Sequence, residues 1–211
     1  MKKDLPKATA RRMAEYYRQF LRLQEQGVEV INSFELEKYI KIEATTIRRD
    51  FSYIGDLGKQ RVGYNVAKVV DELQRVLGLQ EPKKVILIGA GHLGTALFNF
   101  NYIKGNNIYI TECYESDITR IGVKIGDVTI RNIADLETSV ASDVYAAILA
   151  VPSSQTQKVA DRLVALGFKG FLNFSQDRIN VPKDVTVENI DLANSLQTLM
   201  YLVDTKMHEK K

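Results

Sequence analysis

Three glycines near the middle of the chain have the spacing that a nucleotide phosphate requires. They lie at positions 89, 91 and 94 in the run GAGHLG, directly after the apolar stretch KKVILI. In a strand–loop–helix unit the first glycine permits a tight turn, the second lets the backbone approach a pyrophosphate, and the third lets the helix pack against the strand. The N–H groups that begin the helix then point at the phosphates. We predict dinucleotide contacts from Gly89, Ala90, Gly91, His92, Leu93 and Gly94.

An acidic residue about 20 positions beyond such a loop should accept hydrogen bonds from the adenosine ribose. Glu112 and Glu115, in the apolar run NIYITECYE, both qualify. We favour Glu115, because it lies at the end of the expected strand rather than within it. A carboxylate there disfavours a 2′-phosphate, so the predicted cofactor is NAD(H) rather than NADP(H).

The chain lacks an obvious proton donor for hydride-transfer chemistry, which usually needs one beside the nicotinamide. Of the two histidines, His92 lies inside the phosphate loop and His208 in a charged tail. Tyr64 and Lys68 have the Tyr-x-x-x-Lys spacing of short-chain dehydrogenases but precede the glycine loop, whereas those enzymes carry the motif well after it. We interpret that spacing as coincidence and Cys113, on an apolar strand, as an inert core thiol.

We therefore assign no catalytic residue and no metal site, and predict that the protein is not an enzyme. Two alternatives stay open. One is an NAD-dependent oxidoreductase with an appended helical domain, and the other is a Rossmann-like protein that binds another nucleotide such as coenzyme A.

The elements after position 79 alternate between strands and helices. Buried strands are expected in KKVILIG, NIYITECYE and VYAAILAV, and further strands in GFLNF and VTVENI. Repeated strand–helix–strand units predict a doubly wound parallel sheet, a Rossmann fold, over residues 79–190. Val151 and Pro152 follow one of these strands, where its carboxyl end meets the ligand crevice.

Residues 1–78 have mostly helical apolar spacing. A helix is expected over 8–26, and Asn32 with Glu35 matches a capping box that begins a short helix reaching position 40. A second short helix follows in TTIRRDFSYIG, then a hairpin in GDLGKQRVGYN, then a helix capped by Asn65 and ended by Gly78. This order predicts a winged helix-turn-helix domain.

The second helix of such a unit enters the major groove of DNA. Ile47 and Phe51 are spaced to face the core, so the polar residues between them point outward. Residues 1–78 carry an excess of four positive charges, which alone would fit an ordinary solvated surface. The expected contacts to double-stranded operator DNA are Thr45, Thr46, Arg48 and Arg49 on that helix, Lys59, Arg61 and Tyr64 in the hairpin, and Arg11 and Arg12 on the first helix.

The C-terminal run DLANSLQTLMYLVDTKM forms one apolar stripe of Leu192, Leu196, Leu199, Val203 and Met207. The stripe could cover its own domain, but we favour a subunit interface, because a winged helix generally reads a two-fold site as a dimer. One cysteine, no secretory signal and no apolar run of membrane-spanning length predict a cytoplasmic protein without a membrane partner.

Four segments, in order over almost the whole chain, resemble the bacterial Rex family of redox-sensing transcriptional repressors. They are TTIRRDFSYIGDLGKQRVGYNV, GAGHLG, AVPSSQTQKVADRLVALGFKGFLNF and VENIDLA. The resemblance implies a homodimeric repressor that binds operator DNA when free or NAD⁺-bound and is released by NADH. It also implies three regions: a DNA-binding domain over 1–78, an NAD(H) domain over 79–190 and a swapped dimerisation helix with its tail over 191–211.

The resemblance also assigns individual residues. Arg48 and Arg49 match the recognition-helix pair, and Lys59 and Arg61 match the wing. Val151 and Pro152 match the turn on the nicotinamide side, and Asp191 matches an acid near the domain junction.

Two positions depart from the family. His92 stands where Asn is frequent, and Phe100 stands where a nicotinamide-side Tyr is frequent, with Tyr102 two positions further on. A pocket of Phe100, Val151 and Pro152 would favour the neutral ring of NADH over the charged ring of NAD⁺, because burying an unpaired charge is costly.

Overall fold

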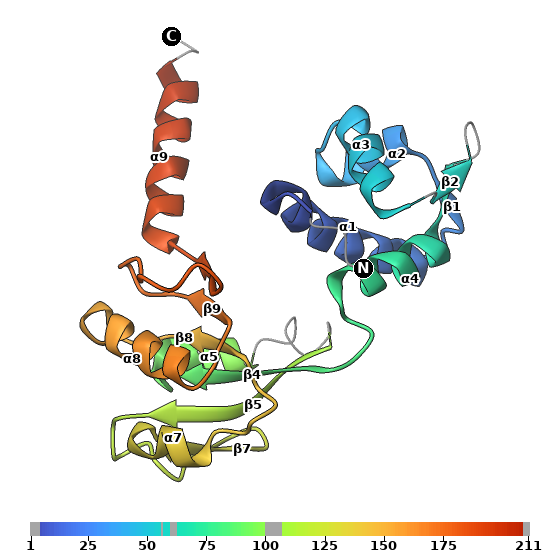
Figure 1. Cartoon of the computed structure of the whole chain (residues 1–211). Coiled ribbons are helices and arrows are strands. Elements are labelled where there is room, and N and C mark those ends of the chain that lie inside the picture. The colour runs from blue at the N-terminus through green and yellow to red at the C-terminus, as the bar shows by residue number, and fades with distance from the viewer. Residues whose placement is uncertain (1–4, 56, 60–62, 100–106, 209–211) are drawn as a thin grey trace. The chain divides into compact units, whose positions relative to one another are not determined.

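The computed structural model of the chain describes residues 5–55, 57–59, 63–99 and 107–208, and it describes Lys59 without its side chain. The chain separates into two compact units, Met1–Glu81 and Pro82–Lys211 (Figure 1). Within the described ranges, no helix is both long enough and apolar enough to cross a membrane.

The N-terminal unit combines four helices with a small antiparallel sheet of strand order β1-β3-β2. Its elements are α1 (Lys7–Glu25), β1 (Val30–Ile31), α2 (Ser33–Ile40), α3 (Ala44–Ile54), β2 (Gly58–Lys59), β3 (Gly63–Asn65) and α4 (Val66–Leu77). The predicted tight helix pair, hairpin and closing helix are present, and they confirm this half of the predicted fold class. Strand β1 was not predicted, because two residues are too few to show a period.

Local hydrogen bonds explain where these helices begin and end. The Asn32 side chain accepts the N–H groups of Phe34 and Glu35, and the Glu35 carboxylate accepts the Asn32 N–H, so the predicted capping box is confirmed. Lys41 adopts a left-handed conformation (φ 54°) that ends α2. The Glu37 carboxylate then accepts the N–H of Ala44 at 3.1 Å, which joins α2 to the start of α3.

The core of this unit lies between α1, α3 and α4. Phe51 of α3 is at its centre, with its ring edge-to-face against Tyr16 at 5.1 Å and against Tyr64 at 4.8 Å between centroids. The buried α1 residues Met13, Phe20 and Leu23 complete this packing.

The C-terminal unit is built on a seven-stranded sheet of order β10-β9-β8-β4-β5-β7-β6, parallel except for the β6–β7 pair. The strands are β4 (Lys83–Ile88), β5 (Ile108–Glu115), β6 (Lys124–Ile125), β7 (Val128–Asn132), β8 (Ala146–Leu149), β9 (Gly170–Asn173) and β10 (Thr186–Asn189). The helices are α5 (His92–Asn99), the 3₁₀ turn η1 (Ile133–Asp135), α7 (Leu136–Ser139), α8 (Ser153–Ala165) and α9 (Leu192–His208). The predicted doubly wound parallel sheet is confirmed, and the β6–β7 hairpin at its edge was not predicted.

Alternate residues of the central strands face two different cores. Ile86 and Ile88 pack with Leu163 of α8 and Leu136 of α7, whereas Leu87 packs with Phe98 of α5. Helices therefore cover both faces of the sheet, which is why its central strands read as continuous apolar runs.

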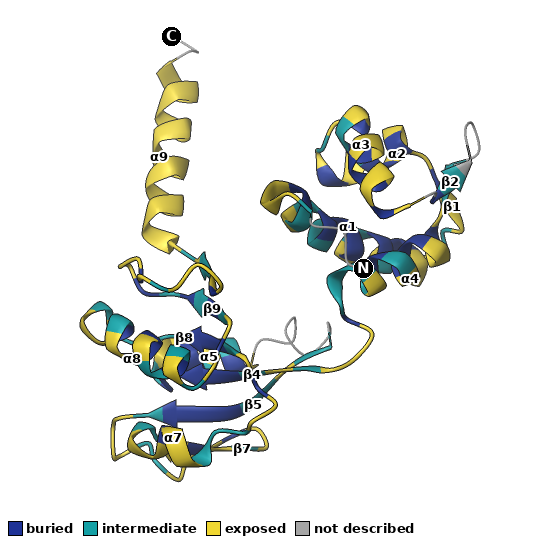
Figure 2. Ribbon diagram, in the orientation of Figure 1, coloured by how far each residue is buried: buried dark blue, intermediate teal, exposed yellow. Residues whose placement is uncertain are grey.

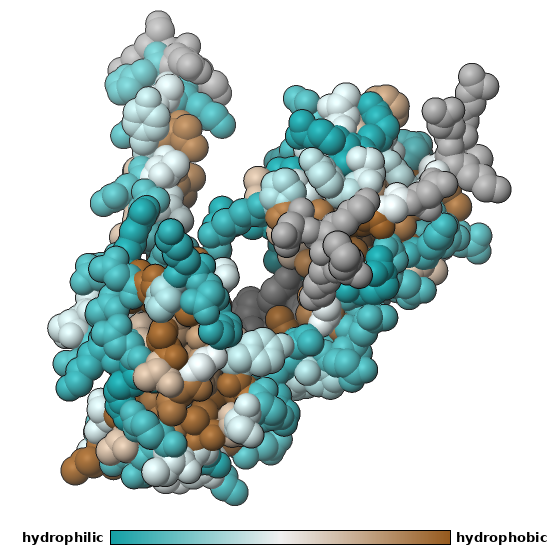
Figure 3. Space-filling view, in the orientation of Figure 1, coloured by the Kyte–Doolittle hydropathy of each residue, from teal (hydrophilic) through white to brown (hydrophobic). Residues whose placement is uncertain are grey.

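Helix α9 is exposed along its whole described length, including its leucines (Figure 2). Hydrophobic side chains are visible along it in the space-filling view (Figure 3). None of its residues is buried against the sheet, so its predicted apolar stripe is uncovered in the single chain.

Candidate cofactor crevice and nucleic-acid interface

The strand order places a crevice at the carboxyl ends of β4 and β8. The chain continues from β4 to β5 on one side, while β8 pairs with β4 on the other. Ligands of doubly wound sheets bind where the order reverses in this way. A cavity of about 860 Å³ opens there, which is in the size range of cofactor sites.

Two of the three loop glycines are required by the protein itself. Gly89 has a φ of +96°, and a Cβ at this position would collide with the carbonyl oxygen of Ala150. A Cβ at Gly94 would overlap the carbonyl oxygen of Gly89. Gly89 therefore permits the tight turn beside Ala150, and Gly94 permits the close packing of α5 on the end of β4, as the sequence pattern predicted.

Gly91 is different, because a Cβ there would meet no protein atom within 4 Å. Gly91 lines the cavity together with His92 and Leu93. The free space beside its backbone fits the close approach of a pyrophosphate.

Glu115 lies on the cavity wall at the end of β5. Its Oε2 accepts the N–H of Ala90 at 2.7 Å. Its Oε1 accepts the N–H groups of Ser116 and Asp117 at 2.6 and 3.1 Å. Burial alone would raise the pKa of this carboxyl, but the backbone donors of Asp117, Ala90 and Ser116 hold the pKa below its ordinary value. The Glu115 carboxyl is therefore ionised at neutral pH and hydrogen-bonded to the glycine loop through Ala90.

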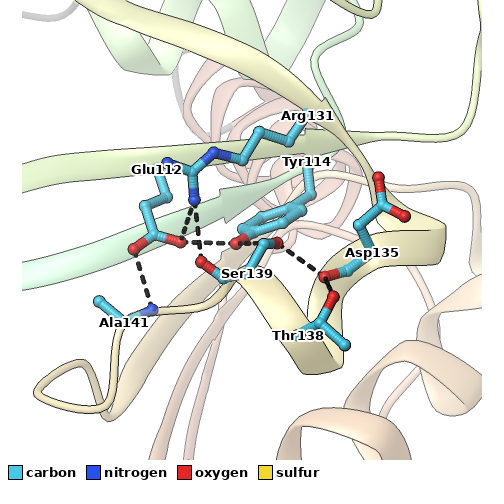
Figure 4. Close-up of polar contacts among 7 residues, drawn as sticks. All are labelled: Glu112, Tyr114, Arg131, Asp135, Thr138, Ser139 and Ala141. Atoms are coloured by element: carbon cyan, nitrogen blue, oxygen red, sulfur yellow. Dashed lines mark hydrogen bonds and ion pairs between the residues drawn. The ribbon is translucent and has the colours of Figure 1, made fainter.

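Glu112 occupies a separate polar network, drawn in Figure 4. Its side chain is buried, and it accepts hydrogen bonds from Tyr114 Oη at 2.6 Å and from the Ala141 N–H at 3.0 Å. Arg131 lies 3.4 Å from the same carboxylate. These contacts link β5 to β7 and to the end of α7, and Glu112 is not among the cavity-lining residues. Of the two glutamates left open by the sequence, only Glu115 reaches the crevice.

Three further cationic side chains, which were not predicted from the sequence, line the crevice. Arg120 donates to the Ala90 carbonyl oxygen, and Arg162 forms a two-point ion pair with Glu137 at 2.6 and 2.7 Å. Lys158 has no ion pair with any described residue. The signal was available for two of them, because Lys158 and Arg162 are one helical turn apart on the helix that starts at Pro152.

The remaining predicted residues of this unit lie in three places. Val151 and Pro152 line the cavity. Asp191 is exposed and caps α9 by accepting the Asn194 N–H at 2.8 Å. Phe100 and Tyr102 lie outside the described residues.

Cys113 is buried, and burial, with the nearby Glu115 charge, raises the pKa of its thiol to about 12. The interpretation of an inert thiol fits this placement.

In the N-terminal unit, the predicted recognition residues lie on one helix. Thr45, Arg48 and Arg49 are exposed on α3 and Thr46 is half-buried, while Ile47 and Phe51 face the core. Arg61 lies outside the described residues, as does the Lys59 side chain. Tyr64 packs on Phe51, and its half-buried ring belongs to the core as well as to the hairpin.

Arg12 does not have the open placement that its predicted phosphate contact requires. Its guanidinium forms a two-point ion pair with Asp50, at 2.5 Å from Nε and 2.8 Å from Nη2. The Asp50 side chain is fully buried, and that of Arg12 is 24% exposed. Arg12 therefore joins α1 to α3, whereas Arg11 beside it is exposed.

Comparisons with known proteins match each half separately. The family model described as "CoA binding domain" matches residues 80–176. The family model described as "Putative DNA-binding protein N-terminus" matches residues 4–52.

Relatives match almost the whole length. The redox-sensing transcriptional repressor Rex of Halalkalibacterium halodurans is 45% identical over 199 residues, covering 94% of each chain. Two crystal structures of RSP, a Rex-family repressor, match 99% of this chain at 32% sequence identity. One is a complex with β-NAD⁺ and operator DNA (TM-score 0.90, 97% of that chain), and the other is a complex with β-NADH (TM-score 0.88, 99% of that chain). The chain belongs to the Rex family of redox-sensing transcriptional repressors.

Proposed function

We propose that this repressor binds operator DNA through α3 and the β2–β3 hairpin, and binds NAD(H) in the crevice at the ends of β4 and β8. One observation carries the proposal: a dinucleotide crevice with an ionised glutamate occurs in the same chain as an exposed basic helix of a winged helix-turn-helix. The RSP complexes with NAD⁺, NADH and operator DNA support both assignments. The regions are 1–78 for DNA, 79–190 for the cofactor and 191–211 for dimerisation.

Family membership confirms the prediction of a repressor that is not an enzyme, and removes the oxidoreductase alternative. We infer that it acts in the bacterial cytoplasm, where its operator lies.

The proposed cofactor contacts are the loop residues Gly89 to Gly94, the ribose acceptor Glu115, and the nicotinamide-side residues Val151, Pro152 and Phe100. When NAD(H) is bound, its ring supplies the signal, since only its oxidised form is charged. The chain holds the pyrophosphate on the loop and surrounds the ring with apolar groups, which favours the neutral form. Asp191 and Tyr102 are proposed to act near the domain junction.

NADH is expected to weaken operator binding more than NAD⁺ does. A tenfold difference in operator affinity needs about 1.4 kcal/mol of coupling between the two sites. Fluorescence anisotropy of a labelled operator duplex, titrated with the protein at saturating NADH or NAD⁺, measures this difference. Equal operator affinity in the two titrations would contradict redox sensing, while leaving DNA binding intact.

The match to a CoA-binding family model makes coenzyme A the competing ligand to test. Its ribose carries a phosphate, which would lie near the ionised Glu115 carboxylate. We expect calorimetry to show binding of NADH and much weaker binding of coenzyme A.

Helix α9 is proposed to form the homodimer, exchanged between subunits as the family resemblance implies. Leu192, Leu196 and Leu199 are 63%, 59% and 54% exposed in the single chain. Most of the stability of a helix in a protein comes from packing of its apolar face, so the uncovered stripe of α9 needs a partner surface.

Leu196→Glu is expected to weaken dimerisation by about 100-fold or more, because it would place an unpaired charge in the interface. Analytical ultracentrifugation measures the dimer, and affinity for a palindromic duplex should fall with it. Thr205→Glu is the control, since Thr205 lies on the opposite side of α9 from this stripe. A dimer unchanged in Leu196→Glu would show that α9 is not the interface.

A further inference from the structure

Arg12, Arg48 and Arg49 of the N-terminal unit have three different surroundings. Arg12 is paired with the buried carboxylate of Asp50, which neutralises its charge. Arg49 is exposed, and its side chain has no polar partner among the described residues; only its backbone carbonyl accepts a hydrogen bond, from Ser52 Oγ. The Arg48 side chain is held by uncharged groups, so its position is fixed while its positive charge is not neutralised.

Two groups at the start of α2 fix the Arg48 side chain. Its guanidinium carbon lies 5.4 Å from the centroid of the Phe34 ring, in a cation–π contact. Its Nη1 donates a hydrogen bond to Ser33 Oγ at 2.9 Å, and Ser33 is buried and therefore fixed in place. Neither partner carries a charge, so Arg48 keeps its positive charge and its remaining N–H groups for a ligand.

Phe34 itself is unusual, because its side chain is 66% exposed and has no ring contact with another described aromatic residue. The backbone N–H groups at this end of α2 are already used by the Asn32 cap, and the Glu35 carboxylate adds a negative charge there. This helix end is therefore a poor phosphate site. The exposed position of the Phe34 ring is explained better by its contact with the Arg48 guanidinium.

We propose that Phe34 is a specificity-determining positioning residue, which together with Ser33 orients Arg48 to read a guanine in the major groove. Arginine recognises guanine by donating two hydrogen bonds to O6 and N7, and this geometry requires the guanidinium plane to be fixed. Holding the side chain in advance lowers the entropy lost on binding. Arg49, which is not held, serves as a phosphate contact. The inference rests on the proposed DNA binding and goes beyond it by separating the two arginines.

The test uses the full chain and a duplex obtained by selection from a randomised-sequence library. Each guanine of that duplex is replaced in turn by 7-deazaguanine, which lacks the N7 acceptor but keeps its base pairing. We expect the wild type to lose about tenfold in affinity at one guanine of each half-site. Arg48→Ala should lose this sensitivity, and Arg49→Ala should keep it while binding all duplexes more weakly.

The Phe34 variants then decide the inference. Phe34→Leu keeps an apolar side chain without the π-face, so the discrimination at that guanine should fall about three- to tenfold. Phe34→Tyr should keep it. Ser33→Ala, which removes only the hydroxyl, should reduce discrimination independently of the ring. Tyr39→Leu is the matched control, because Tyr39 is a second exposed aromatic residue of α2, with 56% exposure.

Wild-type discrimination in Phe34→Leu would overturn the inference, as would an equal loss in Tyr39→Leu. A uniform weakening on every duplex, without a change at the single guanine, would also overturn it. Failure of the wild type to select any duplex would instead overturn the proposed DNA binding, and this inference with it.

Discussion

Replacing Asp50 with alanine is expected to unfold the N-terminal unit and to abolish operator binding, while NADH binding is retained. The fully buried Asp50 carboxylate accepts hydrogen bonds from Arg12 and, at 2.8 Å, from Tyr16 Oη. The substitution leaves a mostly buried guanidinium and a buried hydroxyl without their partner. Removing one member of such a pair costs about 3–5 kcal/mol, a large share of the stability of a small domain.

Hydrogen exchange of the full chain, followed peptide by peptide, measures this effect. Peptides from α1 and α3 should lose protection, and peptides from β4 and β5 should keep it. Arg49→Ala is the control, since it should weaken DNA binding without loss of protection. Protected α1 peptides in Asp50→Ala would show that the pair does not hold the unit together.

The Arg12–Asp50 pair also makes the stability of the N-terminal unit depend on pH, and the direction of this dependence can be stated. Burial alone would raise the pKa of Asp50, but the hydrogen bonds from Arg12 and Tyr16 lower it below its ordinary value of 3.8. The ionised Asp50 therefore stabilises the folded unit at pH values above 3.8. This stabilisation is lost as the pH falls through the lower pKa that Asp50 has in the folded protein.

Gly91→Ala and Gly94→Ala are expected to abolish NADH sensing by different routes. At Gly94 the new methyl would overlap a backbone oxygen, so α5 must move away from β4. Overpacking of this kind costs about 1–3 kcal/mol of stability, and it displaces the phosphate-binding N–H groups. At Gly91 the methyl meets no protein atom, so stability should be unchanged. It would enter the space proposed for the pyrophosphate, and NADH affinity should fall by at least about tenfold.

Thermal unfolding and NADH titration of the two variants separate these routes. Both variants should still bind operator DNA, and NADH should no longer release it. Normal NADH affinity in Gly91→Ala would place the pyrophosphate elsewhere in the crevice.

Much of the fold could be predicted because its signals are local. The Asn32 capping box, the left-handed Gly78 and the glycine loop each depend on residues within a few positions of one another. Apolar runs long enough to show a period located the main helices and the buried strands. The two-residue strands β1 and β6 were missed, because a period cannot be read from two residues and their pairing depends on distant partners.

The sequence by itself determined that the chain has a glycine-rich strand–loop–helix segment and a helix with exposed basic residues, since each is a property of one continuous segment. Between Glu112 and Glu115, which are three positions apart on one expected strand, the sequence favoured Glu115 only because it lies at the end of that strand. The tertiary structure separates their surroundings, because Glu115 lines the crevice at the carboxyl edge of the sheet, while Glu112 is buried beside the end of α7. The tertiary structure also determines which partners Arg12 and Arg48 contact, although both are simply basic residues of a helix in the sequence. One meets a buried carboxylate 38 positions away and the other a ring and a hydroxyl about 15 positions away. Charge on a side chain is encoded locally, but whether that charge is neutralised or left available depends on what the fold brings beside it.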